Sequence, residues 1–179
     1  IPSVDVPAGY TTLFVFPYSV GFQFSGFKNL AALNEAITKR LKNLGVTTLL
    51  FMRHLELIEY EIKISGKEAS GEYLLDAEPV NDHCTRVSAI ESEDDKTDES
   101  LSFIKFSMPI DSRVSTRTID VAFTVATDKE GKTTFQKAKN PYISVYFPTE
   151  TESKLDFIVQ GPFRTTPNRS SVPADEEEN

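Results

Sequence analysis

The sequence contains no tryptophan, one cysteine (Cys84) and two histidines (His54 and His83). A single cysteine excludes a disulfide within the chain, and so few soft ligands argue against a bound metal. No apolar run reaches the roughly 20 residues that a membrane-spanning helix needs, and no secretory signal pattern is present. We therefore expect an intracellular protein that neither crosses a membrane nor holds a metal ion.

Motifs of nucleotide chemistry and of nucleophilic catalysis are also missing. There is no Walker-type phosphate loop and no G-x-G-x-x-G. His83 and Cys84 are adjacent, so in an extended chain they point to opposite faces and cannot share a metal. A Cys84 nucleophile activated by His54 has no supporting spacing, and a half-buried thiol is the simpler interpretation. The chain alone does not have the residues of a complete enzyme.

The charge balance is acidic and the rest of the composition is ordinary. The chain has 27 acidic and 19 basic residues, a formal net charge of -8, and 39% hydrophobic residues that include thirteen phenylalanines. Such a composition is typical of a globular protein, and 179 residues suffice for one good-sized domain or two small ones. A uniformly acidic surface repels phosphate backbones, which disfavours nucleic-acid binding.

One helix is predicted over residues 29–44. Its apolar residues recur at steps of three and four and form one stripe. Asn29 is a suitable N-cap, and Gly45 stands where a left-handed residue ends a helix. The stripe consists of Leu30, Leu33, Ile37, Leu41 and Leu44.

The remaining periodic segments favour β-strands, so the sequence predicts an α+β fold with a mainly antiparallel sheet and few helices. A strand is expected over 11–18, followed by a loop, and a buried strand over 46–52. Alternation begins in 53–64, slips at Leu57–Ile58, and is followed by a turn at 65–71 and a hairpin partner at 72–78. Residues 91–99 are expected to be a solvated acidic loop, and 128–132 a turn. Four more alternating runs cover 100–110, 118–127, 142–148 and 155–161.

Two of these runs each carry an apolar face. Ile104, Phe106 and Met108 share one face of the first run. In the second run the shared face consists of Ile119, Val121, Phe123 and Val125.

The segment GPFRTTPNR, residues 161–169, is unusual in so acidic a chain. Two prolines restrict its backbone, several hydroxyl and amide side chains supply hydrogen bonds, and Arg164 and Arg169 supply charge. Recognition of phosphate or carboxylate uses these three ingredients. A basic loop that pairs with the local acids of 175–178 is an equally simple interpretation, because proline and threonine also form ordinary turns.

Three segments, in this order, resemble the sacsin-like and No-Vein-like branch of the gyrase, heat-shock chaperone, histidine kinase and MutL ATPase superfamily. AGYTTLFVFPY is similar to the strand that closes the nucleotide-binding domain of that branch. VTTLLFMRHLELIEYEI is similar to an LLFLRNI-type strand. The block from YISVYFPT to GPFRTTPNR resembles an FFPT-type strand, a Leu-x-Phe strand and a Gly-Pro-aromatic-x-Thr-Thr-x-x-Arg loop, and is the most specific of the three.

The resemblance implies a domain organisation. Residues 1–25 correspond to the trailing strand and exit of an ATPase domain, and residues 26–179 to the transducer-like middle domain. The Glu-to-Asn helix motif and the Asp-x-Gly-x-Gly loop of the nucleotide site do not occur in this sequence. The resemblance therefore places the ATP and Mg site in a domain that precedes Ile1, with which this chain is expected to interact.

The resemblance also implies a role for the 161–169 loop. The middle domain of the ninety-kilodalton heat-shock chaperone sends an arginine to the ATP γ-phosphate, and Arg169 corresponds to it. Arg164, Thr165 and Thr166 match the motif of the branch, and Asn168 neighbours Arg169. These four residues are expected to support nucleotide binding. The chain is thus expected to sense ATP as part of an ATPase and to be inactive alone. The alternative is a non-catalytic interaction module that docks on a protein partner, or self-associates, through its sheet and the aromatic loop 18–27.

Overall fold

The computed structural model describes residues 8–9, 26–64, 66–94, 96–111, 114–139 and 141–173. The strand expected over 11–18, most of the aromatic loop 18–27 and the expected domain boundary at residue 25 lie outside these ranges. By its internal contacts the chain divides into two units, Ile1–Arg40 and Leu41–Asn179.

The predicted helix is confirmed as α1, Leu30–Lys42. The side-chain oxygen of Asn29 accepts a hydrogen bond from the Ala32 backbone N–H at 2.9 Å, which caps the first turn. Leu33 is the buried residue of the helix. Gly45 has a φ of 85°, a left-handed conformation that glycine adopts without steric cost. No helix among the described residues is long and apolar enough to cross a membrane.

Nine strands form one sheet in the described part of the second unit. They are β1 (Leu57–Ile64), β2 (Lys67–Asn81), β3 (Cys84–Glu93), β4 (Lys96–Asp111), β5 (Val114–Thr127), β6 (Thr133–Gln136), β7 (Tyr142–Val145), β8 (Phe147–Glu152) and β9 (Ile158–Gln160). Their order is β1-β2-β3-β4-β5-β9-β7-β8, and β6 also pairs with β5. Only the pairing of β7 with β9 is parallel. The fold is therefore α+β with a mainly antiparallel sheet, as predicted.

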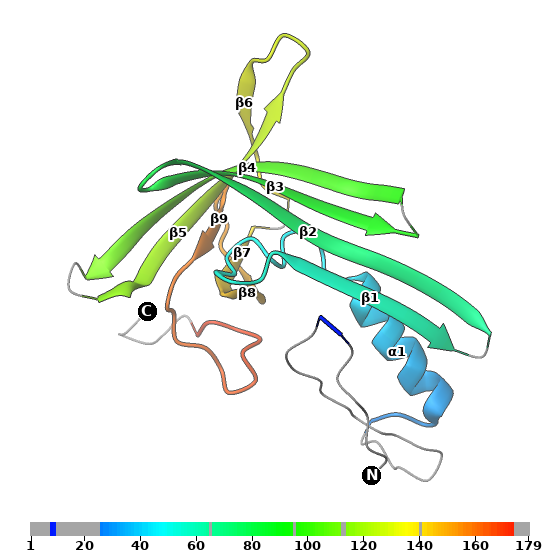
Figure 1. The fold of residues 1–179 in the computed structure, drawn as a ribbon. Coiled ribbons are helices and arrows are strands. Elements are labelled where there is room, and N and C mark those ends of the chain that lie inside the picture. Colours follow the sequence, from blue (N-terminus) through cyan, green and yellow to red (C-terminus); the bar gives the residue numbers. More distant parts are fainter. Residues whose placement is uncertain are drawn as a thin grey trace. The chain divides into compact units, whose positions relative to one another are not determined.

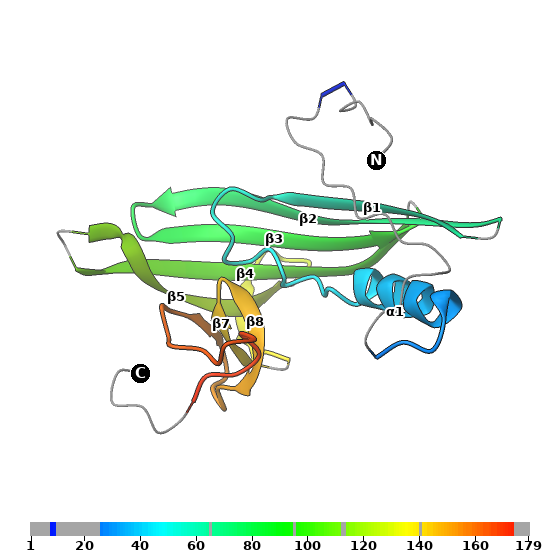
Figure 2. The same ribbon diagram turned by 90° about the horizontal axis from the view of Figure 1, so that it is seen from below.

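The long strands β1 to β5 lie side by side (Figure 1 and Figure 2), and the hairpin of β5 and β6 rises out of the sheet in Figure 1. The register explains this departure. The end of β5 pairs with β6 from Thr124 to Thr127, while the preceding residues 120–122 pair with β9. Because both partners use the same edge of β5, the β6 end must diverge from the sheet that β9 continues.

The hydrophobic core of the second unit lies on one face of the sheet. Directly opposite residues of neighbouring strands share a face. The buried side chains of this face are Tyr73, Leu75, Val87, Ala89, Phe103, Ala122 and Ile158. They pack in one cluster with Val46, Leu49, Leu50 and Phe51 of the segment that follows α1.

That covering segment was predicted to be a strand, and this prediction is wrong. Residues 46–51 form successive turns, in which backbone hydrogen bonds run from Thr48 to Gly45 (3.0 Å), from Leu50 to Thr47 (3.1 Å) and from Met52 to Leu49 (2.9 Å). Burial of the apolar side chains against the sheet selects these turns. A short apolar run has no period from which a strand can be distinguished from other buried backbone.

Three further expectations are corrected. The acidic segment 91–99 is not a loop, because β3 continues to Glu93 and pairs with β4 from Lys96 onward. The run 142–148 comprises two strands, β7 and β8, which meet at Tyr146. The turn expected at 65–71 is shorter than predicted, since β1 extends to Ile64 and β2 begins at Lys67. The alternation of β1 is confirmed, and its slip at Leu57–Ile58 coincides with the start of the strand.

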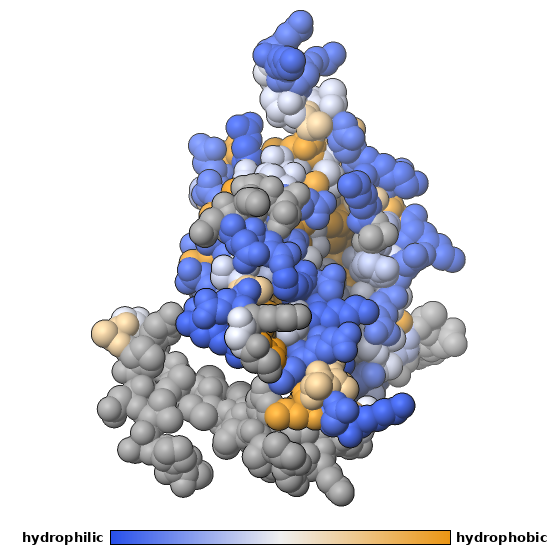
Figure 3. Space-filling view, turned by 90° about the vertical axis from the view of Figure 1, so that its right-hand side faces the viewer, coloured by the Kyte–Doolittle hydropathy of each residue, from blue (hydrophilic) through white to orange (hydrophobic). Residues whose placement is uncertain are grey.

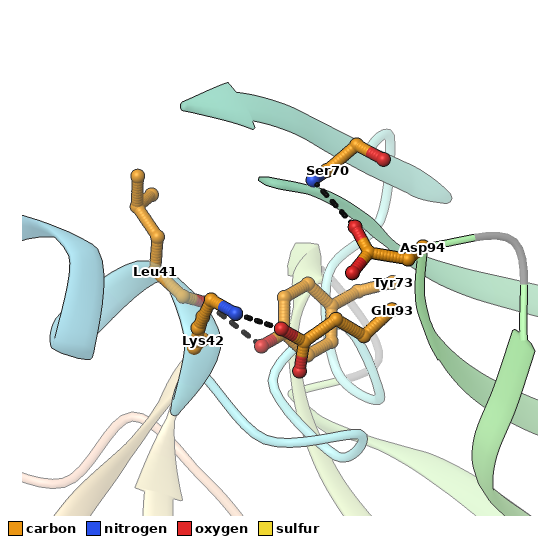
Figure 4. A network of polar contacts seen from close by, with 6 residues as sticks. All are labelled: Leu41, Lys42, Ser70, Tyr73, Glu93 and Asp94. Atoms are coloured by element: carbon orange, nitrogen blue, oxygen red, sulfur yellow. Dashed lines mark hydrogen bonds and ion pairs between the residues drawn. The ribbon is translucent and has the colours of Figure 1, made fainter. Parts of the chain in front are cut away.

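Polar contacts join the end of α1 to the sheet within the second unit (Figure 4). The Tyr73 hydroxyl donates a 2.7 Å hydrogen bond to the Leu41 carbonyl, and Lys42 forms an ion pair with Glu93. Asp94, in the turn between β3 and β4, accepts a 3.1 Å hydrogen bond from the Ser70 backbone N–H. Burial, together with the charge of Glu91, raises the pKa of Tyr73 to about 12.

Candidate functional site: the loop after strand β9

The loop predicted to contact anions begins at a fixed point of the sheet. Strand β9 lies between β5 and β7, where Gln160 is opposite Asp120 on one side and Ser144 on the other. The Gly161 backbone N–H continues this pairing with a 3.2 Å hydrogen bond to the Ser144 carbonyl. Gly161 is buried, and a β-carbon at this position would lie 2.9 Å from the ring of Phe163. The close approach of that ring therefore requires glycine.

A network around Asn168 sets the shape of the loop. The Asn168 side-chain oxygen accepts hydrogen bonds from the Thr166 hydroxyl (2.7 Å), the Ser170 hydroxyl (3.0 Å) and the Ser170 backbone N–H (3.3 Å). Thr166 and Ser171 are joined in both directions. The Thr166 backbone N–H donates to the Ser171 carbonyl at 3.0 Å, and the Ser171 N–H donates to the Thr166 hydroxyl at 3.2 Å. Thr166 and Asn168 thus stabilise the loop itself.

The far end of the loop is attached to the edge strand β8. The Glu150 backbone N–H donates a 2.7 Å hydrogen bond to the Ser170 carbonyl, and the Val172 N–H donates a 2.9 Å bond to the Thr151 hydroxyl. Both ends of the loop are therefore held by strands. Such attachment lowers the conformational freedom of the residues between them.

Arg169 has a left-handed backbone. Its φ is 58°, and its N–H donates a 2.7 Å hydrogen bond to the Thr166 carbonyl. Four non-glycine residues of the described part have a positive φ, and three of them, Tyr146, Lys154 and Arg169, lie between β7 and the end of this loop. Non-glycine residues in this conformation persist only where surrounding contacts hold them, and they gather at functional sites.

The structure places the predicted site residues in two groups. Thr166 and Asn168 contact each other in the hydrogen-bonded turn, and Thr165 is half-buried beside them. Arg164 and Arg169 are both exposed. The Arg169 side chain forms no ion pair with any residue in the described part of the chain. No cluster of three or more metal-ligating side chains occurs among the described residues.

A buried polar cluster, missed by sequence reasoning, lies on the core face beside the start of the loop. Asp120, Gln160 and Ser144 are 9%, 3% and 1% exposed, and they form one cross-strand row. Thr118 donates a 3.1 Å hydrogen bond to Asp120 and lies 3.2 Å from an Arg53 guanidinium nitrogen. The Gln160 side-chain oxygen is buried without a hydrogen-bond partner in the described structure.

Lys105 belongs to the same face. Its ammonium donates a 3.3 Å hydrogen bond to the Leu50 carbonyl. Burial lowers the pKa of Lys105, and the negative charge of Asp120 partly opposes this effect. The alternation in the sequence could have revealed that both side chains are buried, since Lys105 shares a face with Phe103 and Asp120 shares one with Ala122. Through Lys105 and Thr118, strands β4 and β5 contact Leu50 and Arg53 of the segment that follows α1.

The other single residues considered in the sequence lie apart from this loop. His54 lies in an exposed bend and His83 in an exposed turn, while Cys84 is a buried free thiol at the start of β3. The alternation of its neighbours predicted a strand at His54, and this prediction is wrong.

Comparisons with protein-family models, with curated proteins and with solved structures each found no match.

Proposed function

We propose that the 161–173 loop contacts an anion through Arg169, and that this anion is the phosphate of ATP bound by a preceding domain. The observation that carries the proposal is the division of roles within the loop. Thr166, Asn168 and Ser170 use their polar groups to hold the backbone, whereas the Arg169 side chain is exposed. The loop is thus a rigid support for the Arg169 guanidinium.

The physical advantage of this arrangement is pre-organisation. An arginine fork binds phosphate oxygens through parallel charge-assisted hydrogen bonds. Because the loop is already ordered, binding does not have to fix its backbone as well. The left-handed φ of Arg169 is maintained by the 2.7 Å hydrogen bond to Thr166 and by the attachment of Ser170 to β8.

The same loop supports a transducer role, in which the state of the nucleotide changes the position of a sheet. A phosphate that binds Arg169 pulls on a segment that is continuous with β9, and β9 contacts both β5 and β7. In this proposal ATP and Mg are held mainly by the preceding domain. Arg169 supplies charge when the γ-phosphate is transferred, and reports its loss afterwards.

The test compares Arg169→Ala, Arg169→Lys and, as a control, Lys139→Ala, an exposed cation outside the loop. Each change is made in a polypeptide that joins the preceding domain to this chain. ATP affinity and ATP turnover are measured separately. We expect Arg169→Ala to lower turnover by about 100-fold, Arg169→Lys to restore little of it because lysine lacks the fork, and Lys139→Ala to leave it unchanged. Unchanged turnover in Arg169→Ala would contradict the proposal.

A further inference from the structure

The face of the sheet opposite the core carries a corner of aromatic rings. Phe123 of β5 is in contact with three other phenylalanines, with ring centroids 6.1 Å from Phe106, 5.6 Å from Phe135 and 5.0 Å from Phe157. The rising hairpin of β5 and β6 forms one wall of the corner, and β4 forms its floor. The corner contains a pocket of about 500 Å³ lined by Phe106, Phe123, Phe135, Gln136, Lys137 and Asp156.

This apolar surface is open to solvent. Phe135 is 69% exposed and Met108 is 68% exposed, and the same face continues through exposed Phe106, Ile110 and Ile119. Figure 3 shows hydrophobic surface below the hydrophilic tip of the β5–β6 hairpin. The apolar faces identified in the sequence lie on the side of the sheet opposite the core. Phe106, Met108 and Ile119 are exposed there, whereas Val125 is buried. Contiguous apolar surface of this kind marks interaction sites.

Carboxylates lie farther along the same face of the sheet. One cross-strand row runs from Asp76 through Ser88, Ser102 and Val125 to Phe135. A neighbouring row joins Glu78 to Arg86, Ile104 and Phe123. Directly opposite residues share a face, so Asp76 and Glu78 lie on the aromatic side of the sheet.

Two bases on this side of the sheet have acidic neighbours. Arg86 lies directly opposite Glu78, and Lys137 forms a 2.7 Å ion pair with Asp156. Asp76 instead lies opposite Ser88. Asp82 is exposed in the turn before β3. The carbonyl of His83 in this turn accepts a hydrogen bond from the backbone N–H of Ser107, which lies between Phe106 and Met108 in the sequence. Asp76, on the aromatic side of the sheet, and Asp82, in the turn before β3, therefore add negative charge near this apolar surface.

We propose that this corner binds a basic peptide segment that inserts an aromatic or large aliphatic side chain among the phenylalanines. Apolar anchors fill the pocket, and lysine or arginine residues on either side meet Asp76 and Asp82. A second copy of this chain fits less well, because it would bring a surface of the same acidic character, from a chain of net charge -8, against these carboxylates. The inference does not depend on the Arg169 proposal.

The test uses the 179-residue chain and three fluorescent synthetic peptides. One alternates lysine with phenylalanine and leucine, one has the same apolar residues alternating with glutamate, and one is oligolysine. Fluorescence anisotropy gives the affinities at low and high salt. We expect the lysine–phenylalanine peptide to bind at least about 10-fold more tightly than either comparison peptide, and less tightly as the salt concentration rises.

Variants then locate the binding surface. Phe135→Ser and Met108→Ser alter highly exposed side chains, so the fold should persist, and each should weaken binding by about 10-fold. Asp76→Asn combined with Asp82→Asn should weaken binding and reduce its salt dependence. The matched control is Phe147→Ser, because Phe147 is 52% exposed but lies in β8, outside the pocket lining. This control should bind like the parent chain.

Several outcomes would overturn the inference. Equal binding of the peptide with glutamate would show that charge does not select the partner. Equal binding of oligolysine would show that apolar side chains in the pocket do not contribute to selection. Failure of all three peptides to bind would exclude a site for such segments. A dimer seen by sedimentation and abolished by Phe135→Ser would assign the corner to a second copy instead.

Discussion

The ring of Tyr60 in β1 lies over Gly71 in β2. The two residues are directly opposite in the antiparallel register, and a β-carbon at Gly71 would overlap the Tyr60 hydroxyl. The Tyr60 ring also approaches Tyr73, with centroids 6.2 Å apart, at the margin of the core. Glycine, ordinarily unfavourable inside a strand, is therefore the residue that allows this ring to lie against the sheet.

Gly71→Ala is expected to lower the free energy of unfolding by about 1–2 kcal/mol, because the added methyl group displaces the ring. In a Tyr60→Thr background the same change should cost nothing or stabilise by about 0.5 kcal/mol, since alanine loses less backbone entropy than glycine. Chemical denaturation of the four proteins in this double-mutant cycle provides the measurement. An equal cost in both backgrounds would show that the ring contact is not the cause.

Tyr73 predicts a loss of stability at alkaline pH. Its pKa is raised from 10.0 to about 12 in the folded chain, whereas an unfolded tyrosine releases its proton near the ordinary value. Between these values the unfolded state binds fewer protons, so the free energy of unfolding falls as the pH rises through this window. We expect a contribution of about 3 kcal/mol from the shift of roughly two pKa units.

The comparison with Tyr73→Phe isolates this effect from the other tyrosines. Phenylalanine removes the titration and the hydrogen bond to Leu41, so the variant should be less stable at neutral pH, and the difference should shrink above pH 10. Burial lowers the pKa of Lys105, so this residue makes the free energy of unfolding rise with pH, at pH values below 10.5. The effect is the same in both proteins and does not change the difference between them. A constant difference across the alkaline range would contradict the prediction.

Asn168 is expected to control the order of the 161–173 loop. Asn168→Ala removes the acceptor of three hydrogen bonds and should cost about 1–2 kcal/mol of local stability. Asn168→Asp retains an acceptor oxygen at this position and is the matched control. Amide hydrogen exchange at Ser170 and Arg169 measures the effect. We expect faster exchange in the alanine variant, with most of the protection retained in the aspartate variant.

Two aspartates of different burial provide a further comparison. Asp120 is 9% exposed, accepts a hydrogen bond from Thr118 and faces the partly buried cation of Lys105. Asp120→Asn should cost about 2 kcal/mol, because it leaves that cation without its carboxylate. Asp156→Asn breaks only the ion pair with Lys137, in which both side chains are more than 70% exposed, and should change stability by less than about 0.5 kcal/mol. Thermal denaturation distinguishes the two cases.

Local signals predicted the elements that depend on local chemistry. The cap at Asn29, the left-handed Gly45 and the alternation of β1 are each determined by residues close in sequence. The acidic segment 91–99 was misassigned because its charges predict solvation, although Glu91 and Glu99 are directly opposite in the paired strands. Strand β3 was missed for a related reason, since its pairing with β2 and β4 outweighs a mixed polar sequence.

The loop motif was recognisable from the sequence, but its surroundings were not. Arginine, threonine and asparagine in GPFRTTPNR predict an anion contact that involves Arg164 and Arg169. The insertion of β9 between β5 and β7 depends on pairings across many residues, so no local pattern reports it. For the same reason the polar row of Asp120, Gln160 and Ser144 becomes visible only when the strands are assembled.

Strand β9 also determines how a mechanical load spreads through this chain. It is antiparallel to β5 and parallel to β7, with hydrogen bonds to both. A pull along the strand from Gly161 therefore loads these bonds in shear, all together, and cannot open them one after another as in a hairpin peeled from its end. The three residues Ile158–Gln160 therefore connect the β1–β5 part of the sheet to the β7–β8 hairpin and resist forces that pull the two apart.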